Sequence, residues 1–277
     1  MKQRIITGII LILIVFWAIF ALSPKIFPLA LGILVLGCSW EWSRFFKTCL
    51  SGSQRFLYMA SILVGLLLSQ QFVGISFLAS LGFWLLVIVG IYQAQKQNKP
   101  MELSDFGIGL AGFFVLVPFY NAIMQLWQTA PWLIIVLLLI TAFADTGAYF
   151  LGRAIGKKPL APTISPKKTV EGLIGGMISA SVGVLALSWL MVPLSWAQYI
   201  ALAVVTFFLA LLSVIGDLFE SVLKRQRGLK DSGYILPGHG GLLDRLDSVF
   251  AVAPAFTIFG ILAQIVVFVP SFSALCV

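Results

Sequence analysis

Charged residues are scarce in this chain. Only 10% of its 277 residues are Asp, Glu, Lys or Arg, whereas 60% are hydrophobic. A soluble domain carries roughly 25% charged residues, and no soluble fold hides so much apolar surface from water. The shortage excludes an ordinary soluble domain and indicates a protein whose natural solvent is lipid.

Cysteine and histidine are scarce as well. The three cysteines, Cys38, Cys49 and Cys276, form no CxxC pair, and His239 is the single histidine. An odd number of widely spaced cysteines predicts neither a disulfide nor a zinc site. No organelle transit segment is visible, so a bacterial inner membrane is the expected location.

Long apolar runs fill most of the chain. A helix needs about 20 apolar residues to cross a membrane. The runs predict an all-α, polytopic integral membrane protein with about nine transmembrane helices. We expect the first to be retained, because no small-residue cleavage site follows it. The predicted spans are residues 5–22, 26–43, 56–70, 72–92, 106–126, 131–151, 171–193, 197–220 and 249–270.

The basic residues are distributed unevenly over the predicted loops. With nine spans, all of the 18 basic residues except Lys25 lie on one side of the membrane. By the positive-inside rule that side is the cytosol, which places the N-terminus inside and the C-terminus outside. The net charge of +8 comes from short clusters between apolar runs. This pattern favours lipid headgroups and phosphorylated substrates as partners and argues against nucleic acid.

The informative polar residues fall in two stretches, 145–176 and 217–247, both assigned to the cytosolic side. We therefore divide the chain into N-terminal transmembrane helices, residues 1–130, and a C-terminal catalytic transmembrane region, residues 131–277. The active site is expected at the cytosolic face of the second region.

Several acidic residues lie at or inside the ends of apolar runs. A carboxylate such as Asp145 within a membrane helix costs about 2.5–3.5 kcal/mol, so it needs a cation, a metal or a water-filled cavity. Asp217 has a similar position. Asp244 and Asp247 are three residues apart and share one helix face. Oxygen ligands without cysteine favour a hard ion such as Mg²⁺; the alternatives are a structural ion pair for Asp145 and pairing of Asp244 or Asp247 with Arg245.

Two basic and glycine-rich segments accompany these acids. Lys167 and Lys168 follow Ser165-Pro166 and come just before a predicted helix start, an arrangement that suits phosphate. Positive-inside topology is the alternative reading of such lysines. The turn at residues 237–241 contains His239, which either donates to substrate or orients the turn. Bases for phosphate and oxygen ligands for Mg²⁺ together predict phosphoryl or nucleotidyl transfer at the membrane surface.

A longer pattern narrows this class. Residues 221–247 read SVLKRQRGLKDSGYILPGHGGLLDRLD. This stretch resembles the signature of the phosphatidate cytidylyltransferases, or CDP-diacylglycerol synthases, which runs S-x-x-K-R, K-D and P-x-H-G-G-x-x-D-R-x-D. The upstream stretches DTGAYFLGR and ISPKKTVEG resemble a second region of the same family. The resemblance covers about residues 141–250, and the earlier helices match only in being apolar.

The resemblance implies a function and a set of site residues. The reaction is CTP plus phosphatidate to CDP-diacylglycerol plus pyrophosphate, a step of phospholipid biosynthesis, with Mg²⁺ and K⁺ as a partner ion. It implies that Asp217, Asp244 and Asp247 hold the metal and, with Lys168, are catalytic. A homodimer is left open. The expected substrate-binding residues are Asp145, Lys167, Ser221, Lys224, Arg225, Lys230, Asp231, His239 and Arg245.

Two other classes compete with this interpretation. A CDP-alcohol phosphotransferase or a polyprenyl-phosphate transferase also uses aspartates and Mg²⁺ at the membrane face, but the former needs two Asp-x-x-Asp-like clusters and this chain has one. An ion-coupled transporter would use Asp145 and Asp217 as ion sites. Transporters tend to have repeated halves and binding sites at the midplane, whereas here the polar residues gather at one face.

Overall fold

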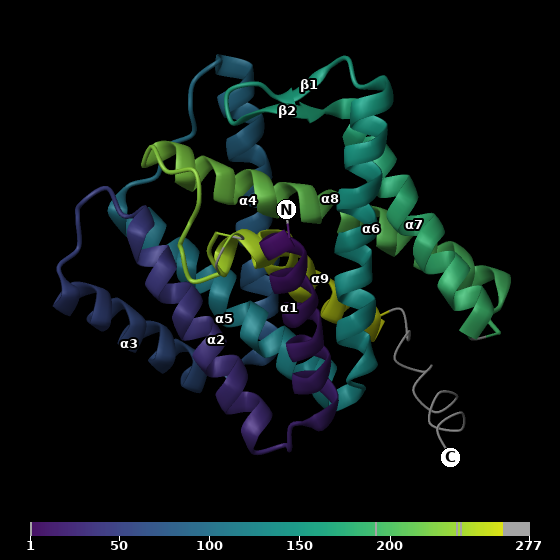
Figure 1. Cartoon of the computed structure of the whole chain (residues 1–277), viewed down its shortest axis with the longest axis horizontal. Helices are drawn as coiled ribbons and strands as arrows, with labels where there is room; N and C mark the ends of the chain where they lie inside the picture. The colour runs from purple at the N-terminus through teal and green to yellow at the C-terminus, as the bar shows by residue number, and fades with distance from the viewer. Residues whose placement is uncertain (1, 192, 237, 239, 263–277) are drawn as a thin grey trace.

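The chain is almost entirely helical in the computed structural model, which describes residues 2–191, 193–236, 238 and 240–262 (Figure 1). In this part, seven helices are long and apolar enough to cross a membrane. The all-α membrane class is confirmed, whereas the number of nine spans stays a prediction. The elements are α1 Lys2–Ala21, α2 Ile26–Trp42, the 3-10 helix η1 Ser43–Phe45, α3 Gly52–Ser69, α4 Val73–Gln97, α5 Asp105–Thr129, α6 Trp132–Ile155, β1 Pro159–Ala161, β2 Ser165–Thr169, α7 Val170–Met191, α8 Trp196–Gln226 and α9 Leu243–Leu262.

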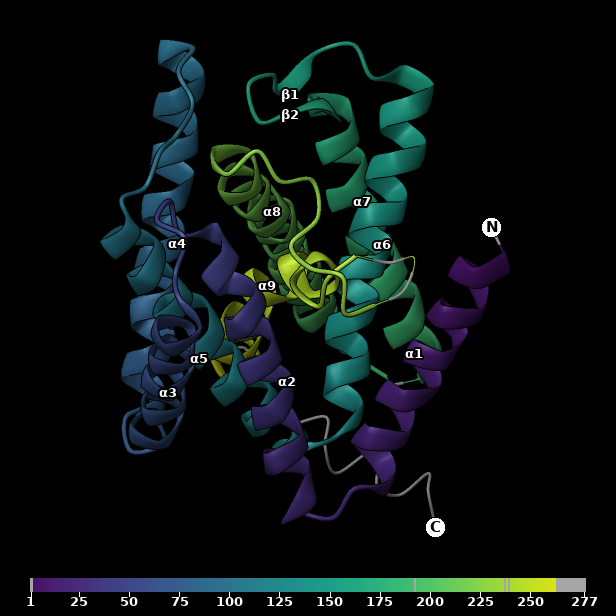
Figure 2. The same cartoon turned by 60° about the vertical axis from the view of Figure 1, so that its left-hand side comes forward.

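Successive helices alternate in direction, so the connections gather at two ends of the bundle. The α4–α5, α6–α7 and α8–α9 connections leave their helices in the upper half of Figure 2. The α1–α2 connection, which holds Lys25, lies at the bottom of the same view. The basic loops therefore share one end, called the polar end below. Their arrangement follows the charge distribution of the sequence.

Helices α3 and α4 are separate elements joined by a short turn. Ser51 caps α3 by accepting from the Gln54 amide at 3.3 Å, and Gln54 returns a hydrogen bond to the Ser51 amide. Residues 70–72 then separate α3 from α4. Buried Asn121 of α5 donates to Ser69 and Ser76, both at 3.0 Å, and so ties α3 and α4 to α5.

A two-stranded sheet, which the all-α prediction did not include, links α6 and α7. Strands β1 and β2 are antiparallel and pair Pro159 with Thr169 and Ala161 with Ser165. The helices on either side approach closely because glycines face the contact: a Cβ added to Gly176 would lie 2.6 Å from the Ala144 carbonyl oxygen. The tight helix pair holds the hairpin over the polar end (Figure 1).

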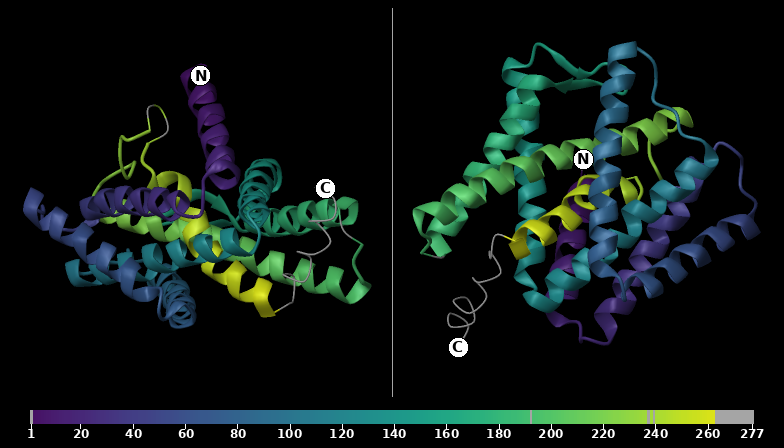
Figure 3. Two further views of the ribbon diagram at one scale, coloured as in Figure 1. Left: turned by 90° about the horizontal axis from the view of Figure 1, so that it is seen from below. Right: turned by 180° about the vertical axis from the view of Figure 1, so that it is seen from behind.

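Helices α8 and α9 form the centre of the bundle. From behind, α8 crosses the molecule obliquely between α4 and α6 (Figure 3). Residues 249–257 of α9 are all buried. An added Cβ at Gly216 of α8 would collide with the Asp247 carbonyl oxygen of α9, so the two backbones are in contact. One hydrophobic cluster extends from Ile19 to Phe256, and helices on both sides of residue 130 share it.

Among the described helix ends, two differ most from the predicted spans. Helix α8 continues to Gln226 rather than ending at residue 220, and α9 begins at Leu243 rather than at residue 249. The apolar runs indicate where a helix crosses lipid, but helical hydrogen bonding continues through the polar residues beyond them. The extra turns carry most of the charged signature residues.

Candidate active site

The first part of the site is a cavity of about 530 Å³ at the polar end. Asp145 of α6, Lys167 and Lys168 of β2, and Asp217 of α8 all line it. The Lys168 ammonium is 2.5 Å from Asp217 Oδ2, and both side chains are partly exposed. The fold thus brings together residues from the two polar stretches that the sequence analysis singled out.

Local hydrogen bonds hold the hairpin that presents the lysines. The Glu171 carboxylate accepts from the Lys157 amide at 3.0 Å and from the Lys158 amide. Thr169 Oγ1 accepts from the Gly172 amide at 3.1 Å and caps the first turn of α7. Lys167 and Lys168 therefore lie on a strand that runs directly into α7, rather than on a turn at the helix start.

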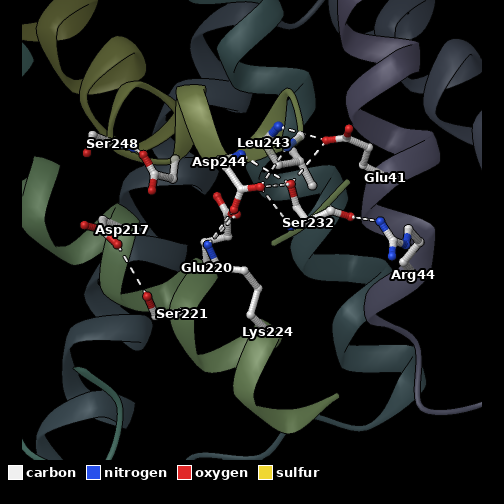
Figure 4. Close-up of polar contacts among 12 residues, drawn as sticks. Glu41, Arg44, Asp217, Glu220, Ser221, Lys224, Ser232, Leu243, Asp244 and Ser248 are labelled. Atoms are coloured by element: carbon white, nitrogen blue, oxygen red, sulfur yellow. Dashed lines mark hydrogen bonds and ion pairs between the residues drawn. The ribbon is translucent and has the colours of Figure 1, made fainter. Parts of the chain in front are cut away.

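The second part of the site is centred on the carboxylate of Asp244 (Figure 4). Its Oδ1 accepts from Lys224 Nζ at 2.7 Å. Its Oδ2 accepts from the Ser232 amide at 2.8 Å, the Ser232 hydroxyl at 2.9 Å and the Gly241 amide at 2.9 Å. Burial raises the pKa of Asp244, but the Lys224 ammonium and the donated amide hydrogen bonds outweigh it and lower the pKa to about 2. The carboxyl group is therefore ionised.

Lys224 lies between two carboxylates in a nearly dry environment. Its ammonium is 2.7 Å from Asp244 Oδ1 and 3.1 Å from Glu220 Oε1, one helical turn away. The side chains of Lys224, Asp244 and Glu220 are only 13%, 10% and 6% exposed. This lysine neutralises buried negative charge, which would otherwise be strongly unfavourable. Asp244 is thus paired with Lys224 of α8.

Asp217, Ser221 and Asp247 lie along the contact between α8 and α9. Ser221 Oγ donates to Asp217 Oδ1 at 3.4 Å, one turn apart on α8. The backbone of Asp247 packs against Gly216, the residue before Asp217. Asp247 Oδ1 accepts from the Ser248 amide at 2.7 Å. Figure 4 shows Asp217 and Ser248 at the same side of the site, away from Arg44.

The carboxylates differ in how well they fit a metal ion. In the described part of the chain, no three His, Cys, Asp or Glu side chains are close enough to form a metal-binding group. Asp217 of α8 and Asp247 of α9 supply carboxylate oxygens from two helices in contact, and such oxygens suit Mg²⁺. Both oxygens of Asp244 are already hydrogen-bonded. The site of three aspartates stays a prediction.

The remaining predicted residues are more peripheral. Arg225 lines a separate cavity of about 390 Å³ with Lys47 and Gln226. Lys230, Asp231 and Arg245 are exposed, on the α8–α9 connection and the first turn of α9. His239 lies outside the described residues, so its two predicted roles stay open.

Sequence reasoning missed Glu41 of α2 and Ser232 of the α8–α9 connection. Glu41 Oε2 accepts from the Leu243 amide at 3.0 Å, and Ser232 bonds Asp244. A signal for Glu41 was present, because it is an ionisable residue inside the predicted span 26–43. The same criterion had singled out Asp145. Ser232 had no comparable signal beyond its place in the signature.

Comparison with known proteins agrees with the signature. Residues 2–263 match the model of the Cytidylyltransferase family. The chain is 34% identical to a phosphatidate cytidylyltransferase of Haemophilus influenzae over 94% of this chain and 98% of that protein. It is 37% identical to the enzyme of the same name from Pseudomonas aeruginosa and 36% identical to that of Bacillus subtilis, in both cases over 92% of this chain and 95% of the relative. This chain therefore belongs to the cytidylyltransferase family.

Proposed function

We infer that this protein is a phosphatidate cytidylyltransferase that converts CTP and phosphatidate into CDP-diacylglycerol and pyrophosphate. The observation that carries the inference is the cavity at the polar end, where Lys167 and Lys168 face Asp145 and Asp217. The names of relatives that align over more than nine-tenths of this chain support it. Family membership argues against the transporter and the other membrane transferases.

The reaction is a displacement at phosphorus. A phosphate oxygen of phosphatidate attacks the α-phosphorus of CTP, and a new P–O bond forms as the bond to the β-phosphate oxygen breaks. Phosphatidate supplies its own nucleophile, so the protein needs no catalytic serine or cysteine. Its contribution is to position the two phosphate groups and neutralise the charge that develops on pyrophosphate.

Cationic side chains supply much of this neutralisation. We assign Lys168 and Lys167 to the substrate phosphates, because both line the cavity and Lys167 is exposed. Lys168 forms an ion pair with Asp217, which holds its ammonium at the cavity wall. Lys224 is nearly buried, and we assign it to fixing Asp244 and the start of α9.

Magnesium is part of the proposal. Asp217 and Asp247 are the residues that would hold it, with Asp244 as the third predicted ligand. When bound, Mg²⁺ would neutralise phosphate charge next to the lysines. The carboxylates of Asp145 and Asp217 face Lys168 in the same cavity.

The test of the activity is an assay of the purified protein. With CTP, phosphatidate and Mg²⁺ we expect release of pyrophosphate and CDP-diacylglycerol in equal amounts. ATP or GTP in place of CTP, and diacylglycerol in place of phosphatidate, serve as controls. Absence of both products with CTP and phosphatidate would reject the proposed function.

The hairpin lysines provide the next prediction. We expect Lys168→Ala to lower kcat/KM about 10²-fold, because it removes a group that stabilises charge developing in the transition state. Lys167→Ala should have a smaller effect in the same direction. Lys157→Ala, a lysine in the same α6–α7 connection that donates its backbone amide to Glu171, is the matched control. Equal kinetics in all three variants would assign the lysines to membrane topology alone.

The metal assignment leads to a prediction about three aspartates. Asp217→Asn, Asp244→Asn and Asp247→Asn are nearly isosteric, so thermal melts should report folded protein. If the carboxylates bind Mg²⁺, turnover should fall by more than about 10²-fold and the Mg²⁺ dependence should shift to higher concentration. Asp244→Asn also leaves buried Lys224 with Glu220 as its remaining partner. Near-normal turnover of Asp244→Asn at ordinary Mg²⁺ would remove it from the ligand set.

Orientation in the membrane is also part of the proposal. We propose that the polar end faces the cytosol of a bacterial inner membrane, because it contains the basic α4–α5, α6–α7 and α8–α9 connections. The C-terminus, residues 263–277, lies outside the described part of the chain. A reporter active only in the cytosol should be active when fused to the N-terminus and inactive when fused to the C-terminus. Activity at both ends would contradict nine spans.

A further inference from the structure

We propose that Glu41 is a positioning residue for cytidylyl transfer, which holds the α8–α9 connection and the first turn of α9 in place. The proposal rests on the proposed function. Glu41 lies near the end of α2, far from the signature in sequence. Its side chain points at Ser232 and Leu243 (Figure 4).

Two hydrogen bonds connect Glu41 to the signature segment. Glu41 is only 1% exposed, and its Oε2 accepts from the Leu243 amide at 3.0 Å and from the Ser232 hydroxyl at 3.3 Å. Leu243 is the first residue of α9, so Glu41 satisfies one of the amides that a helix start leaves without a helical partner.

Ser232 connects Glu41 to Asp244 through hydrogen bonds. Its amide donates to Asp244 Oδ2 at 2.8 Å, and Asp244 Oδ1 accepts from Lys224. Its single hydroxyl hydrogen is shared between Asp244 Oδ2 at 2.9 Å and Glu41 Oε2 at 3.3 Å. The Ser232 hydroxyl therefore lies between the carboxylates of Glu41 and Asp244. A shift of Ser232 would move Asp244 relative to Lys224 on α8.

Arg44, which lies three residues after Glu41, also contacts the α8–α9 connection. Arg44 Nη1 donates to the Ser232 carbonyl at 2.6 Å, and its guanidinium lies 5.1 Å from the centre of the Tyr234 ring. Arg227 Nη1, at the end of α8, donates to the Lys47 carbonyl at 3.1 Å. Residues 41–47 thus bind the α8–α9 connection at several points.

The position of the Glu41 carboxylate explains why residues 233 and 241 of the α8–α9 connection are glycines. A Cβ added to Gly233 or Gly241 would collide with the Glu41 carboxylate, and one at Gly241 would also lie 2.6 Å from the Gly233 amide nitrogen. Only glycine lets the backbone close over the carboxylate in this way. The connection is therefore shaped around the Glu41 side chain.

The two carboxylate oxygens of Glu41 are not equivalent. Oε2 accepts both hydrogen bonds, whereas Oε1 is buried and has no hydrogen-bond partner among the described residues. A buried charge with an unsatisfied oxygen is unfavourable, so charge is not what this position needs. It needs one acceptor oxygen at a defined distance. Glutamine keeps that acceptor, aspartate is one methylene too short, and alanine removes it.

The variants are measured in the CTP and phosphatidate assay with thermal melts. We expect Glu41→Ala and Glu41→Asp to lower kcat/KM at least about tenfold. A substitution far from the reacting atoms that misplaces site groups by about 1 Å lowers the rate up to about 10²-fold. Glu41→Gln should stay within about threefold of the parent. Asn121→Ala, which removes a buried polar residue far from the site, is the control: its melt should fall while kcat/KM is retained. Glu41→Gln as inactive as Glu41→Ala would overturn the proposal.

A double-mutant cycle tests whether Glu41 acts through Ser232. Ser232→Ala alone should lower kcat/KM at least about tenfold, and the double variant Glu41→Ala/Ser232→Ala should be little worse than the worse single variant. If the two single effects multiply to within about twofold of the double variant, the residues act independently. That result would reject the proposal that Glu41 acts through Ser232.

A readout without substrate separates this inference from the proposed function. Lys230 is exposed on the α8–α9 connection, so trypsin cleavage there reports how firmly the connection is held. We expect at least about fivefold faster cleavage in Glu41→Ala, with Glu41→Gln and Asn121→Ala close to the parent, because local opening governs proteolysis. Unchanged cleavage in Glu41→Ala would overturn the proposal. If the parent protein lacks the expected activity, the proposed function fails, whereas cleavage still decides whether Glu41 holds the connection.

Discussion

The ammonium of Lys224 between Asp244 and Glu220 is the contact on which the arrangement of the site depends. All three side chains are nearly excluded from water, so neither carboxylate would be stable there without the lysine. The lysine joins α8 to the first turn of α9. Because Asp244 also accepts from Ser232 and Gly241, the same contact orders the connection between the two helices.

Helix α8 links this buried centre to the open cavity. Asp217, Ser221 and Lys224 follow one another at intervals of four and three residues and so share one face of the helix. Asp217 contacts Lys168 of the hairpin, and Lys224 contacts Asp244 of α9. A displacement of α8 would therefore alter both parts of the site together. Lys224 belongs to the part of the helix that continues past the apolar run to Gln226.

The N-terminal helices contribute more than a hydrophobic surround. Glu41 and Arg44, at the end of α2 and in η1, bind the backbone of Ser232 and the start of α9. Trp42 Nε1 donates to the Ile108 carbonyl at 2.9 Å and fixes this part of α2 against α5. The signature segment is thus held between α2 and α8. A site that is read in sequence as C-terminal depends physically on both halves.

Composition and pattern determined the membrane class, the main helices and the residues of the two polar stretches. Apolar length and charge placement are properties of lipid solvation, which acts on each segment separately, so they are readable along the chain. The signature likewise identified the family, and the resemblance predicted that Lys168, Asp217, Lys224 and Asp244 belong to one site. The helix ends at residues 226 and 243 and the hairpin of β1 and β2 were missed, because polar residues give no apolar signal there.

Which of these residues meet was decided only by the tertiary structure. Pairing of Asp244 with Arg245 was considered, because the two are neighbours in sequence, but Asp244 pairs with Lys224, twenty residues away, once α8 and α9 pack. The contact of Glu41 with Leu243 spans 202 residues and depends on α2 lying against the start of α9. These pairs form because a buried polar group without a hydrogen-bond partner raises the free energy of the folded state. That penalty arises only after the helices have packed and excluded water.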